Sequence, residues 1–373
     1  MKLKYDYKGG QKRENMVLDF AKEAIQNADT HSINFDELRA GKANIKVIGV
    51  GGCGCNMTTW LFNKGINGAT VYGANTDALH LSVTKADEKI LIGKELTRGL
   101  GAGGKPMKGR EAAKESLVDL KKAVGGADMV FVLAGMGGGT GTGAASVIAQ
   151  LAKETGAVVI GVVTMPFESE KARIDKAEFG LAELRENTDT CIVLDNNRLV
   201  DIAGQLPLEQ AFAVANELVS TMVKGIVETI TLPSLINLDY ADVSSIMKNG
   251  GVAVIGIGES DAQDRVHEAV RQALTHPLLD VDYKGATGAL IHITCGPDLK
   301  LEEFDVIGRA VSENLSNEAQ VIIGARISKD FVGKVRVITI MTGVKSPYVL
   351  GKDLDDFNEP RSREMSDLGI DIL

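Results

Sequence analysis

Two glycine-rich segments hold the residues of this sequence that are best suited to chemistry. The first, GVGGCGCN, spans residues 49–56, and the second, GMGGGTGTG, spans residues 135–143. Each follows an apolar run, so we expect each to connect a buried strand to a helix. Glycines at such a point let backbone N–H groups approach phosphate oxygens, and the start of a helix favours negative charge. The two segments therefore predict a site for a phosphate-bearing ligand.

The first segment alone also fits a different ligand. Gly49, Gly51 and Gly54 form a GxGxxG pattern, and Asp77 follows roughly twenty residues later, as in NAD-dependent oxidoreductases. A dinucleotide fold has no use for a second, denser glycine loop, whereas the phosphates of a nucleoside triphosphate need several backbone amide groups. We therefore favour a nucleoside triphosphate and keep the NAD-dependent enzyme as an alternative.

A third glycine-rich segment narrows the class of nucleotide-binding protein. It reads GLGAGGKP and spans residues 99–106. The sequence contains no GxxxxGK[ST], the pattern in which a glycine loop and a lysine hold the phosphates of a P-loop protein. Three glycine loops without that pattern predict a nucleotide site of another kind.

Short apolar runs supply the strands that must position these loops. Most are apolar throughout rather than alternating, as expected for strands buried on both faces of a parallel sheet. We expect the helix after the first loop to begin near Met57, and the helix after the second near Gly143 or Ala144. Residues 45–207 are therefore predicted to form a doubly wound α/β domain. The strands are expected at 45–50, 69–74, 89–92, 128–134, 157–164 and 190–195.

The remaining chain divides into four parts. Residues 208–231 are apolar around most of a helical circumference, which predicts a long central helix buried between two domains. Residues 232–345 are predicted to form a second, smaller α/β domain. Residues 1–44 carry one helical pattern, which fits packing on the body or a partner-binding arm. Residues 346–373 are polar and acidic, which predicts a disordered tail. In the smaller domain, strands and helices are expected at 251–258, 261–275, 289–295, 301–315, 319–327 and 334–341.

The composition argues against several classes of function. The chain has 373 residues, with 41 Lys and Arg against 50 Asp and Glu, so we expect no nucleic-acid partner. No apolar stretch approaches about 18 residues, and the first residues do not resemble a signal peptide. We therefore expect a cytoplasmic protein that does not insert into a membrane. The 4 cysteines are expected to be reduced, and we interpret Cys53 and Cys55 as small buried thiols rather than as metal ligands.

Several of these segments together resemble the tubulin/FtsZ family. GGGTGTG at 137–143 is the signature of that family, and the resemblance covers roughly residues 44–345. The C-terminal DLGIDIL resembles the archaeal type of FtsZ, because it lacks the Pro-containing, basic-ended peptide common in bacteria. The other segments that resemble FtsZ, in the same order, are GANTDA at 73–78, TRGLGAGGKP at 97–106, MPFESE at 165–170, NNRL at 196–199 and LINLDYADV at 235–243.

The resemblance implies the tubulin/FtsZ fold and a specific activity. Residues 45–207 would bind GTP or GDP with Mg²⁺, and residues 232–345 would activate GTP hydrolysis. Subunits would assemble head to tail into a homopolymer that serves cell division, and GTP would be hydrolysed at the joint between subunits. A nucleotide-binding filament protein of low turnover remains an alternative, besides the NAD-dependent oxidoreductase.

The resemblance assigns nucleotide-binding residues to all three glycine loops. Asn75 and Asp77 would lie near the γ-phosphate and Mg²⁺, and Asp77 would act on the metal only indirectly. The other residues that would contact the nucleotide, besides those assigned to its ribose and base, are Gly51, Gly52, Cys53, Gly54, Cys55, Asn56, Ala102, Gly103, Gly104, Gly138, Gly139, Thr140, Gly141, Thr142 and Asn196.

The ribose and the base are assigned to later segments of the chain. By resemblance, Glu170 and Arg173 would face the ribose, and Glu168 is a rival to Glu170. Phe212 and Asn216 would hold the base. A phenyl ring offers a stacking face, and an amide carbonyl oxygen can accept hydrogen bonds from the N1 and N2 hydrogens that guanine has and adenine lacks.

Three polar residues form an NxDxxD pattern before a predicted helix: Asn237, Asp239 and Asp242. Taken alone, Asp239 fits a helix cap, because acidic residues are favoured at helix N-termini. FtsZ uses such carboxylates on one subunit to orient the water that attacks the γ-phosphate held by its neighbour. The resemblance therefore implies that the three residues are catalytic and act on the neighbouring subunit.

The end of the tail carries a short apolar cluster after an acidic spacer. Leu368, Ile370, Ile372 and Leu373 follow a run with almost no large apolar side chains. Such a cluster on a tether can dock in a groove of a partner, while a terminus without function is the alternative. FtsZ proteins use such tails to meet membrane-tethering adaptors. The resemblance therefore implies a SepF-like adaptor and a location at the division site.

Overall fold

The structure is a computed structural model that describes residues 43–232, 234–236, 238–248, 250–275, 286–313 and 315–344. The expected N-terminal helix and the acidic tail with its apolar tip lie outside the described residues, and so does Asn237.

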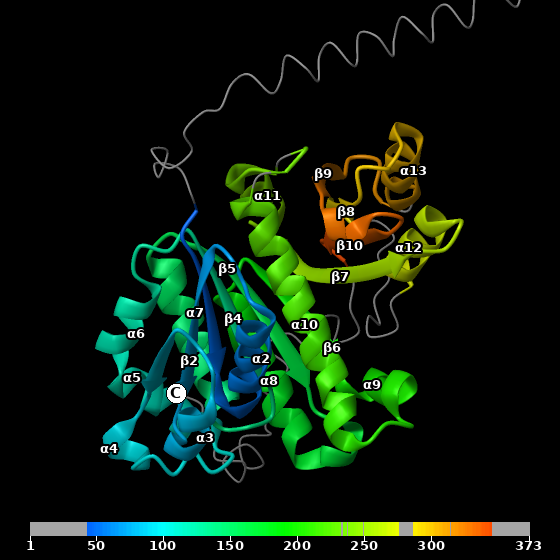
Figure 1. The fold of residues 1–373 in the computed structure, drawn as a ribbon. Helices are drawn as coiled ribbons and strands as arrows, with labels where there is room; N and C mark the ends of the chain where they lie inside the picture. Colours follow the sequence, from blue (N-terminus) through cyan, green and yellow to red (C-terminus); the bar gives the residue numbers. More distant parts are fainter. Residues whose placement is uncertain are drawn as a thin grey trace, which may run out of the picture. The chain divides into compact units, whose positions relative to one another are not determined.

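The first half of the described chain forms a parallel sheet in the order β3-β2-β1-β4-β5-β6 (Figure 1). Neighbouring strands are parallel throughout this part. The strand order reverses between β1 and β4, and ligands of such sheets bind beyond the carboxyl ends of the strands at that point. The strands are β1 (Ile45–Val50), β2 (Ala69–Asn75), β3 (Glu88–Leu91), β4 (Met129–Gly135), β5 (Val158–Met165) and β6 (Thr190–Asp195).

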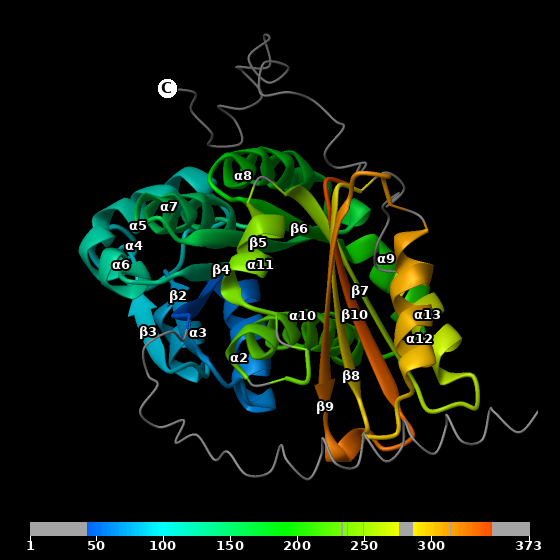
Figure 2. The ribbon, with the colours of Figure 1, turned by 90° about the horizontal axis from the view of Figure 1, so that it is seen from above.

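Helices cover both faces of this sheet, as Figure 2 shows. One face packs against α2 and α10, and the other packs against α7 and α8 through a second apolar core. Both faces of β1 and β4 are buried, which explains why their sequences are apolar throughout. The helices of this half are α2 (Gly51–Lys64), α3 (Ala78–Val83), α4 (Lys94–Thr97), α5 (Pro106–Glu115), α6 (Leu117–Val124), α7 (Thr140–Glu154), η2 (Glu168–Arg173), α8 (Ile174–Glu186) and α9 (Asn196–Ala203).

The long helix α10 (Leu208–Thr231) follows, and its 24 residues span about 36 Å. Its buried side chains lie in the second half, from Val219 to Thr229, where it packs between the two parts of the sheet. Its first half is more open, since Leu208 is 69% exposed and Phe212 is 39% exposed. The central helix is therefore buried along only part of its length.

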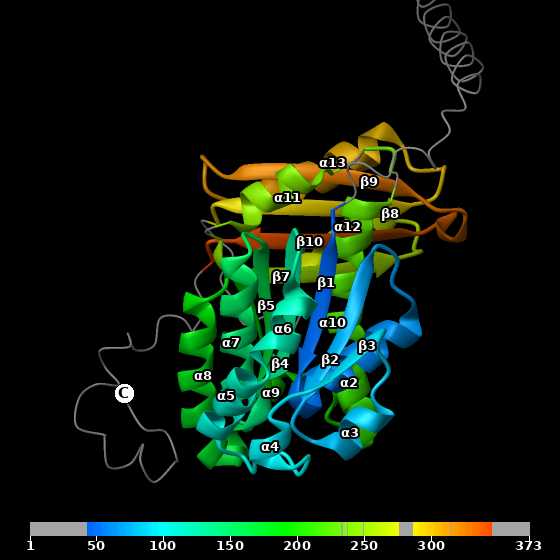
Figure 3. The same cartoon turned by 90° about the vertical axis from the view of Figure 1, so that its left-hand side faces the viewer.

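The second half of the chain continues the sheet in the order β7-β10-β8-β9. β7 pairs with β6 through Thr190↔Gly251, Cys191↔Val252 and Ile192↔Ala253, and Figure 3 shows β7–β10 running crosswise to β1–β5. β10 is antiparallel to both β7 and β8. The elements are α11 (Tyr240–Met247), β7 (Gly251–Ser260), α12 (Arg265–Leu274), β8 (Gly288–Cys295), α13 (Leu301–Ser312), β9 (Gln320–Ile327), η3 (Lys329–Phe331) and β10 (Val335–Thr342).

The predicted fold class is confirmed, and two details of the prediction were wrong. A mostly parallel α/β domain, a long helix and a smaller α/β part are all present. However, α2 begins at Gly51 rather than near Met57, and α7 begins at Thr140 rather than near Gly143 or Ala144. The later part of each glycine segment therefore forms the first turn of a helix. Glycine is poor in a free helix, but here neighbouring strands and helices pack too closely for side chains.

Acid should destabilise the second half of the sheet through His292 on β8. Burial of the ring, followed by the charges of Arg326 and Arg336, lowers the pKa of His292 from 6.5 to about 4. The unfolded chain takes up this proton below about pH 6.5. The stability contributed by the neutral ring is therefore present above that pH and is lost as the pH falls toward 4.

We expect the wild type to lose about 2 kcal/mol more unfolding free energy than His292→Gln between pH 7 and pH 5. Urea unfolding at the two pH values measures both losses. Equal losses in the two proteins would show that His292 does not contribute to acid sensitivity.

Candidate functional site

A cavity of about 350 Å³ opens at the carboxyl ends of the central strands. It lies at the reversal of strand order between β1 and β4, where the topology predicts a ligand. Both glycine loops, η2, α9 and α10 contribute to its wall. The lining residues are Val50, Gly52, Cys53, Gly135, Met136, Gly138, Gly139, Thr140, Gly141, Thr164, Pro166, Phe167, Glu170, Arg173, Asn196 and Phe212.

The first glycine loop is shaped by two close backbone approaches. Gly51 has φ +71°, and a Cβ on it would lie 2.7 Å from the backbone nitrogen of Gly141. A Cβ on Gly54 would lie 2.2 Å from the carbonyl oxygen of Leu133. These contacts hold the start of α2 against β4 and α7. The first-turn N–H groups, which have no partners within the helix, are thereby available to an anion.

The second glycine loop, which follows β4, is hydrogen-bonded to the segment that follows β2. β2 and β4 lie on opposite sides of β1 in the sheet. Thr140 Oγ1 lies 2.6 Å from Thr76 Oγ1, which links the start of α7 to the segment after β2. Thr142 is buried and its hydroxyl has no hydrogen-bond partner in the structure, so it faces the protein interior rather than the cavity. Of the nucleotide-binding residues predicted in this loop, Thr142 does not line the cavity. The others do line it: Gly138, Gly139, Thr140 and Gly141.

The third glycine loop lies behind the second and does not line the cavity. A Cβ on Gly139 would come 2.8 Å from Cβ of Ala102. The loop is held by Gly101 N–H donating to the Thr76 carbonyl oxygen at 3.1 Å. Lys176 Nζ donates to the Gly104 carbonyl oxygen at 2.8 Å. Ala102, Gly103 and Gly104 are therefore brought near the second loop.

Asn75 and Asp77 lie at the end of β2 and also lie outside the cavity lining. The Asp77 carboxylate accepts a hydrogen bond from His80 N–H at 2.9 Å and so caps α3. Asn75 Oδ1 accepts from Asp77 N–H at 3.3 Å, which directs its amide nitrogen to His80 Nδ1 at 3.4 Å. Local hydrogen bonds therefore hold both polar groups in place. They flank Thr76, which contacts Thr140 of the second glycine loop.

The segment η2 separates the two rival ribose residues. Glu170 lines the cavity, and its carboxylate binds the Arg173 guanidinium at 2.6 Å. Glu168 is exposed and does not line the cavity, and its N–H group donates to Asn197 Oδ1 at 2.9 Å. The geometry therefore favours Glu170 over Glu168, with Arg173 beside it. Asn196, at the start of α9, is also on the wall.

Two aromatic side chains close the side of the cavity formed by α10. Phe212 packs edge to face on Phe167, with ring centroids 6.1 Å apart. Asn216 lies one turn further along α10 and does not line the cavity. Phe167 was missed as a site residue, as were Thr164 and Met136. The segment MPFESE contains Phe167, and a phenyl ring directly after a buried strand is the local signal that could have identified it.

The first two cysteines differ from each other in exposure. Cys55 is buried as expected, and burial raises the pKa of its thiol to about 12. Cys53 is exposed and lines the cavity, so the expectation that it is a buried thiol was wrong. Its sulfur lies 3.5 Å from Thr164 Oγ1. The reason is that residue 53 faces the ends of β4 and β5 at the cavity, whereas residue 55 faces β1 and β2.

The acidic pair lies at the start of α11, which follows the C-terminal end of α10, whereas the cavity is lined by Phe212 near the N-terminal end of α10. Figure 1 shows α11 beside one end of α10. Asp239 accepts a hydrogen bond from Asp242 N–H at 2.8 Å, and Asp242 accepts one from Asp239 N–H at 3.3 Å. The pair therefore forms a reciprocal helix cap, and Asp239 remains exposed. Because α10 spans about 36 Å between the two regions, these carboxylates cannot reach the cavity of their own chain.

The described residues hold no group of three or more His, Cys, Asp and Glu side chains that could bind a metal ion. The described helices also include none long and apolar enough to cross a membrane.

Comparison with known proteins agrees with this geometry. Residues 44–204 match the GTPase domain of the tubulin/FtsZ family, and residues 251–345 match the C-terminal domain of the FtsZ family. The chain is 53% identical over 341 residues to cell division protein FtsZ 2 of Methanocaldococcus jannaschii, a match that covers 91% of this chain and 89% of that protein. Neither comparison supports the NAD-dependent alternative.

Two further relatives are similar over most of their length. Cell division protein FtsZ 1 of Thermococcus kodakarensis is 51% identical over 335 residues, which cover 89% of each protein. A solved structure described as an empty FtsZ dimer from M. jannaschii matches with a TM-score of 0.78 at 51% identity, over 83% of this chain and 90% of that one.

Proposed function

Because this chain belongs to the tubulin/FtsZ family and is a GTPase, we propose that it polymerises head to tail and hydrolyses GTP between subunits during cell division. The observation that carries the proposal is the separation of the glycine loops from Asp239 and Asp242 by the length of α10. A single chain holds both halves of a hydrolytic site but cannot bring them together. A second copy stacked on the first can supply the missing half.

Within the cavity, the phosphates would lie along the starts of α2 and α7. Gly52, Cys53 and Gly139–Gly141 line that part of the cavity, their backbone N–H groups would bind the phosphate oxygens, and the two helix N-termini favour negative charge. The third loop would approach the terminal phosphate from behind Gly139. No lining side chain needs to carry a permanent positive charge for this mode of binding.

The nucleoside would lie on the side of the cavity formed by η2 and α10. Glu170 and Arg173 would contact the ribose, and Asn196 would lie next to them. Phe212 would offer its ring to the base, supported from the side by Phe167. Asn216 would accept from the guanine N1 and N2 hydrogens, which needs a small movement of its side chain because it lies just outside the cavity lining.

The side chains present fit a Mg²⁺ ion that is held mainly by the nucleotide. Glu170 is the only carboxylate among the lining residues, and Asp77 already caps α3. Mg²⁺ commonly keeps several waters and binds through phosphate oxygens, with one or two carboxylates nearby. Asp77 would therefore act through a water, and the ion would neutralise charge on the phosphates.

In the proposed reaction, Asp239 and Asp242 of one subunit face the γ-phosphate bound by the next. Their carboxylates would orient the attacking water and accept its proton, as positioned carboxylates do in general base catalysis. Asn237 would complete this group. The reciprocal cap between Asp239 and Asp242 would fix both side chains at the start of α11, so the two roles are compatible.

We expect GTP turnover per subunit to rise steeply above a threshold protein concentration. The reason is that only assembled subunits contain a complete site. Phosphate release and light scattering, measured together with GTP, GDP and ATP across a concentration series, test this expectation. Turnover per subunit that is constant from dilute to concentrated solution would contradict the shared site, and filaments without phosphate release would identify the low-turnover alternative.

The proposed partner at the membrane is a SepF-like adaptor, reached by the tail at the division site. The support is the sequence of the tail, where an acidic spacer ends in Leu368, Ile370, Ile372 and Leu373. Deleting residues 366–373 is expected to leave GTP hydrolysis and filament formation intact and to abolish recruitment to adaptor-coated vesicles. Truncated filaments that still coat such vesicles would place the docking surface elsewhere.

A further inference from the structure

A second cavity of about 350 Å³ lies between α10, the end of α2 and the sheet formed by β8–β10. It has no lining residue in common with the nucleotide cavity. It joins the two halves of the chain, because α2 and α10 form one wall and the second part of the sheet forms the other. The lining residues are Lys64, Asn67, Thr221, Lys224, Gly225, Glu228, His292, Thr294, Arg326, Ser328, Asp330, Phe331, Arg336 and Ile338.

The sheet wall of this cavity carries two arginines on one cross-strand row. Thr294 on β8 is paired with Arg326 on β9 and with Arg336 on β10, so the three side chains lie side by side. Arginines that flank one position repel each other unless anionic groups balance them. In the structure Glu228 binds Arg326 at 2.9 Å, and Glu259 binds Arg336 at 2.6 Å.

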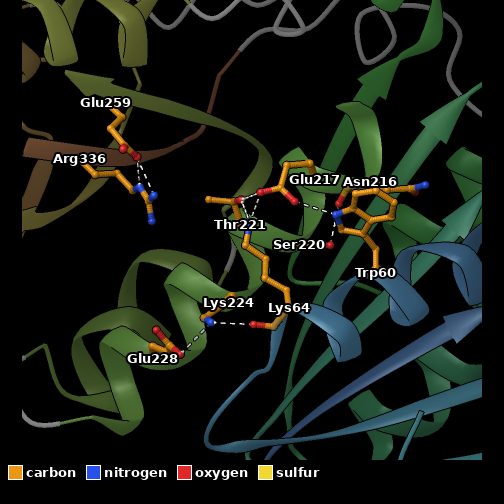
Figure 4. Close-up of polar contacts among 10 residues, drawn as sticks. All are labelled: Trp60, Lys64, Asn216, Glu217, Ser220, Thr221, Lys224, Glu228, Glu259 and Arg336. Carbon is orange, nitrogen blue, oxygen red and sulfur yellow. Dashed lines mark hydrogen bonds and ion pairs between the residues drawn. The ribbon is translucent and has the colours of Figure 1, made fainter. Parts of the chain in front are cut away.

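The helical wall adds two lysines, which Figure 4 shows. Lys64 at the end of α2 binds both Glu217 and Thr221 of α10. Lys224 donates to the Lys64 carbonyl oxygen at 3.2 Å and lies 3.7 Å from Glu228. Glu228 is therefore shared between Lys224 and Arg326, with one carboxylate oxygen facing each cation.

The balance of charge on the lining is positive. Lys64, Lys224, Arg326 and Arg336 line the cavity together with the carboxylates Glu228 and Asp330, whereas Glu217 and Glu259 bind their cations from outside the lining. The four cations keep between about a quarter and a third of their side chains exposed. They are therefore open to an incoming anion.

His292 gives an independent sign that this wall is built for a polar ligand. The residue is 4% exposed, and its Nδ1 has no hydrogen-bond partner. Its Nε2 lies 3.3 Å from Thr294 Oγ1, so a hydroxyl that donates to Nε2 leaves the ring proton on Nδ1 as a donor. A buried polar atom without a partner is unfavourable, and a ligand oxygen that reaches it after a small shift of the ring would satisfy it.

We propose that this second cavity binds a small organic phosphate, held between Arg326 and Arg336 and contacted by Thr294 and the two lysines. Guanidinium groups match phosphate oxygens in pairs of parallel hydrogen bonds, which ammonium groups cannot do. The volume exceeds what a bare phosphate needs and falls in the range of cavities for small organic ligands. Because the ligand would touch α10 and the sheet at once, it would hold the two halves of the chain together.

Trp60 makes this proposal measurable without labels. It is the single tryptophan of the chain, and its Nε1 donates to Glu217 Oε2 at 2.7 Å, beside the Lys64 contact to the same carboxylate. If Lys64 turns toward a bound phosphate, Glu217 loses its contact with this lysine and the surroundings of the indole change. Fluorescence of Trp60 should therefore follow occupancy of the cavity.

The experiment uses full-length protein saturated with GDP, so that the nucleotide cavity is filled. Glycerol 3-phosphate, inorganic phosphate and glycerol are titrated at constant ionic strength while Trp60 fluorescence and thermal unfolding are followed. We expect a saturable fluorescence change and a raised melting temperature with glycerol 3-phosphate in the millimolar range. The response to inorganic phosphate should be weaker, and glycerol, which carries no anionic group, should give none.

Variants separate this site from general charge effects. Arg326→Gln combined with Arg336→Gln should weaken the response about tenfold or more. Arg309→Gln, which removes an exposed arginine paired with Asp305, should not change it. Should the double variant fail to fold, Arg326→Lys with Arg336→Lys keeps the charge and loses the paired geometry, and it should still bind more weakly than the wild type. GDP affinity should be the same in all of them.

Three results would overturn the proposal. An absence of any response in the wild type would exclude the site. A response that survives unchanged in both double variants would place the ligand elsewhere. A response to glycerol or inorganic phosphate as strong as that to glycerol 3-phosphate would show that the cavity does not select organic phosphates.

Discussion

Replacing Asp239 with asparagine should abolish GTP turnover while GTP binding and protein stability stay close to those of the wild type. Asparagine keeps the side-chain oxygen that accepts the Asp242 N–H at 2.8 Å, so α11 stays capped. It lacks the negative charge that would accept a proton from water. A lost general base reduces turnover by about 10²–10⁴-fold.

Asp239→Ala is the informative companion to that variant. It removes the charge and the cap together, so it should lose turnover to the same degree and in addition about 1 kcal/mol of stability. Phosphate release, binding of a fluorescent GTP analogue and urea unfolding of the two variants distinguish catalysis from capping. Turnover retained in Asp239→Asn and lost in Asp239→Ala would mean that Asp239 is only a helix cap.

The shared site also predicts how mixed filaments behave. When Asp239→Asn subunits are added to wild-type subunits, each mutant subunit prevents hydrolysis of the GTP bound by its neighbour, although that neighbour is itself wild type. Turnover per wild-type subunit should therefore fall as mutant is added, while light scattering persists. Turnover in proportion to the wild-type protein alone would argue for a site completed within one chain.

Gly51→Ala is expected to weaken nucleotide binding about 10- to 100-fold. The new Cβ would lie 2.7 Å from the Gly141 backbone nitrogen, at a backbone φ of +71° that alanine rarely adopts. Strain of this kind amounts to roughly 1–3 kcal/mol, and it falls on the contact that sets the spacing of the two glycine loops. The backbone N–H groups of both loops would be displaced from the phosphates.

Gly138→Ala is the matched control, because Gly138 also lines the cavity and a Cβ on it would meet nothing within 4 Å. Its nucleotide affinity should stay within a few-fold of the wild type. Titration of a fluorescent GDP analogue into both variants measures the difference. Equal affinities would show that the close approach at Gly51 is not what shapes the phosphate site.

Local sequence patterns determined the elements and the class of ligand. Apolar runs such as 45–50 and 128–134 predict strands buried on both faces, since only such strands need no polar face. Glycine segments directly after these runs predict phosphate binding, because strand ends, helix starts and close backbone approach are all set within a few residues. The same segments carried the resemblance that the family match confirmed.

Patterns of this kind fail where packing between distant segments decides the outcome. Cys53 and Cys55 are two residues apart and similar in chemistry, yet one lines the cavity and the other is buried against β1 and β2. The helix starts at Gly51 and Thr140 were predicted too late, because glycine lowers helix propensity in isolation. Packing against neighbouring strands and helices outweighs that preference, because it leaves no room for side chains.

The sequence by itself thus determined which residues could bind a phosphate chain, because this capacity depends on a few consecutive glycines between a strand and a helix. Only the tertiary structure decided which of them face one space and which face away. It paired Phe167 with Phe212, placed Asp239 a helix length from the glycine loops, and set Arg326 and Arg336 on either side of Thr294. Each arrangement depends on the register and packing of segments far apart in the chain, which no local pattern contains.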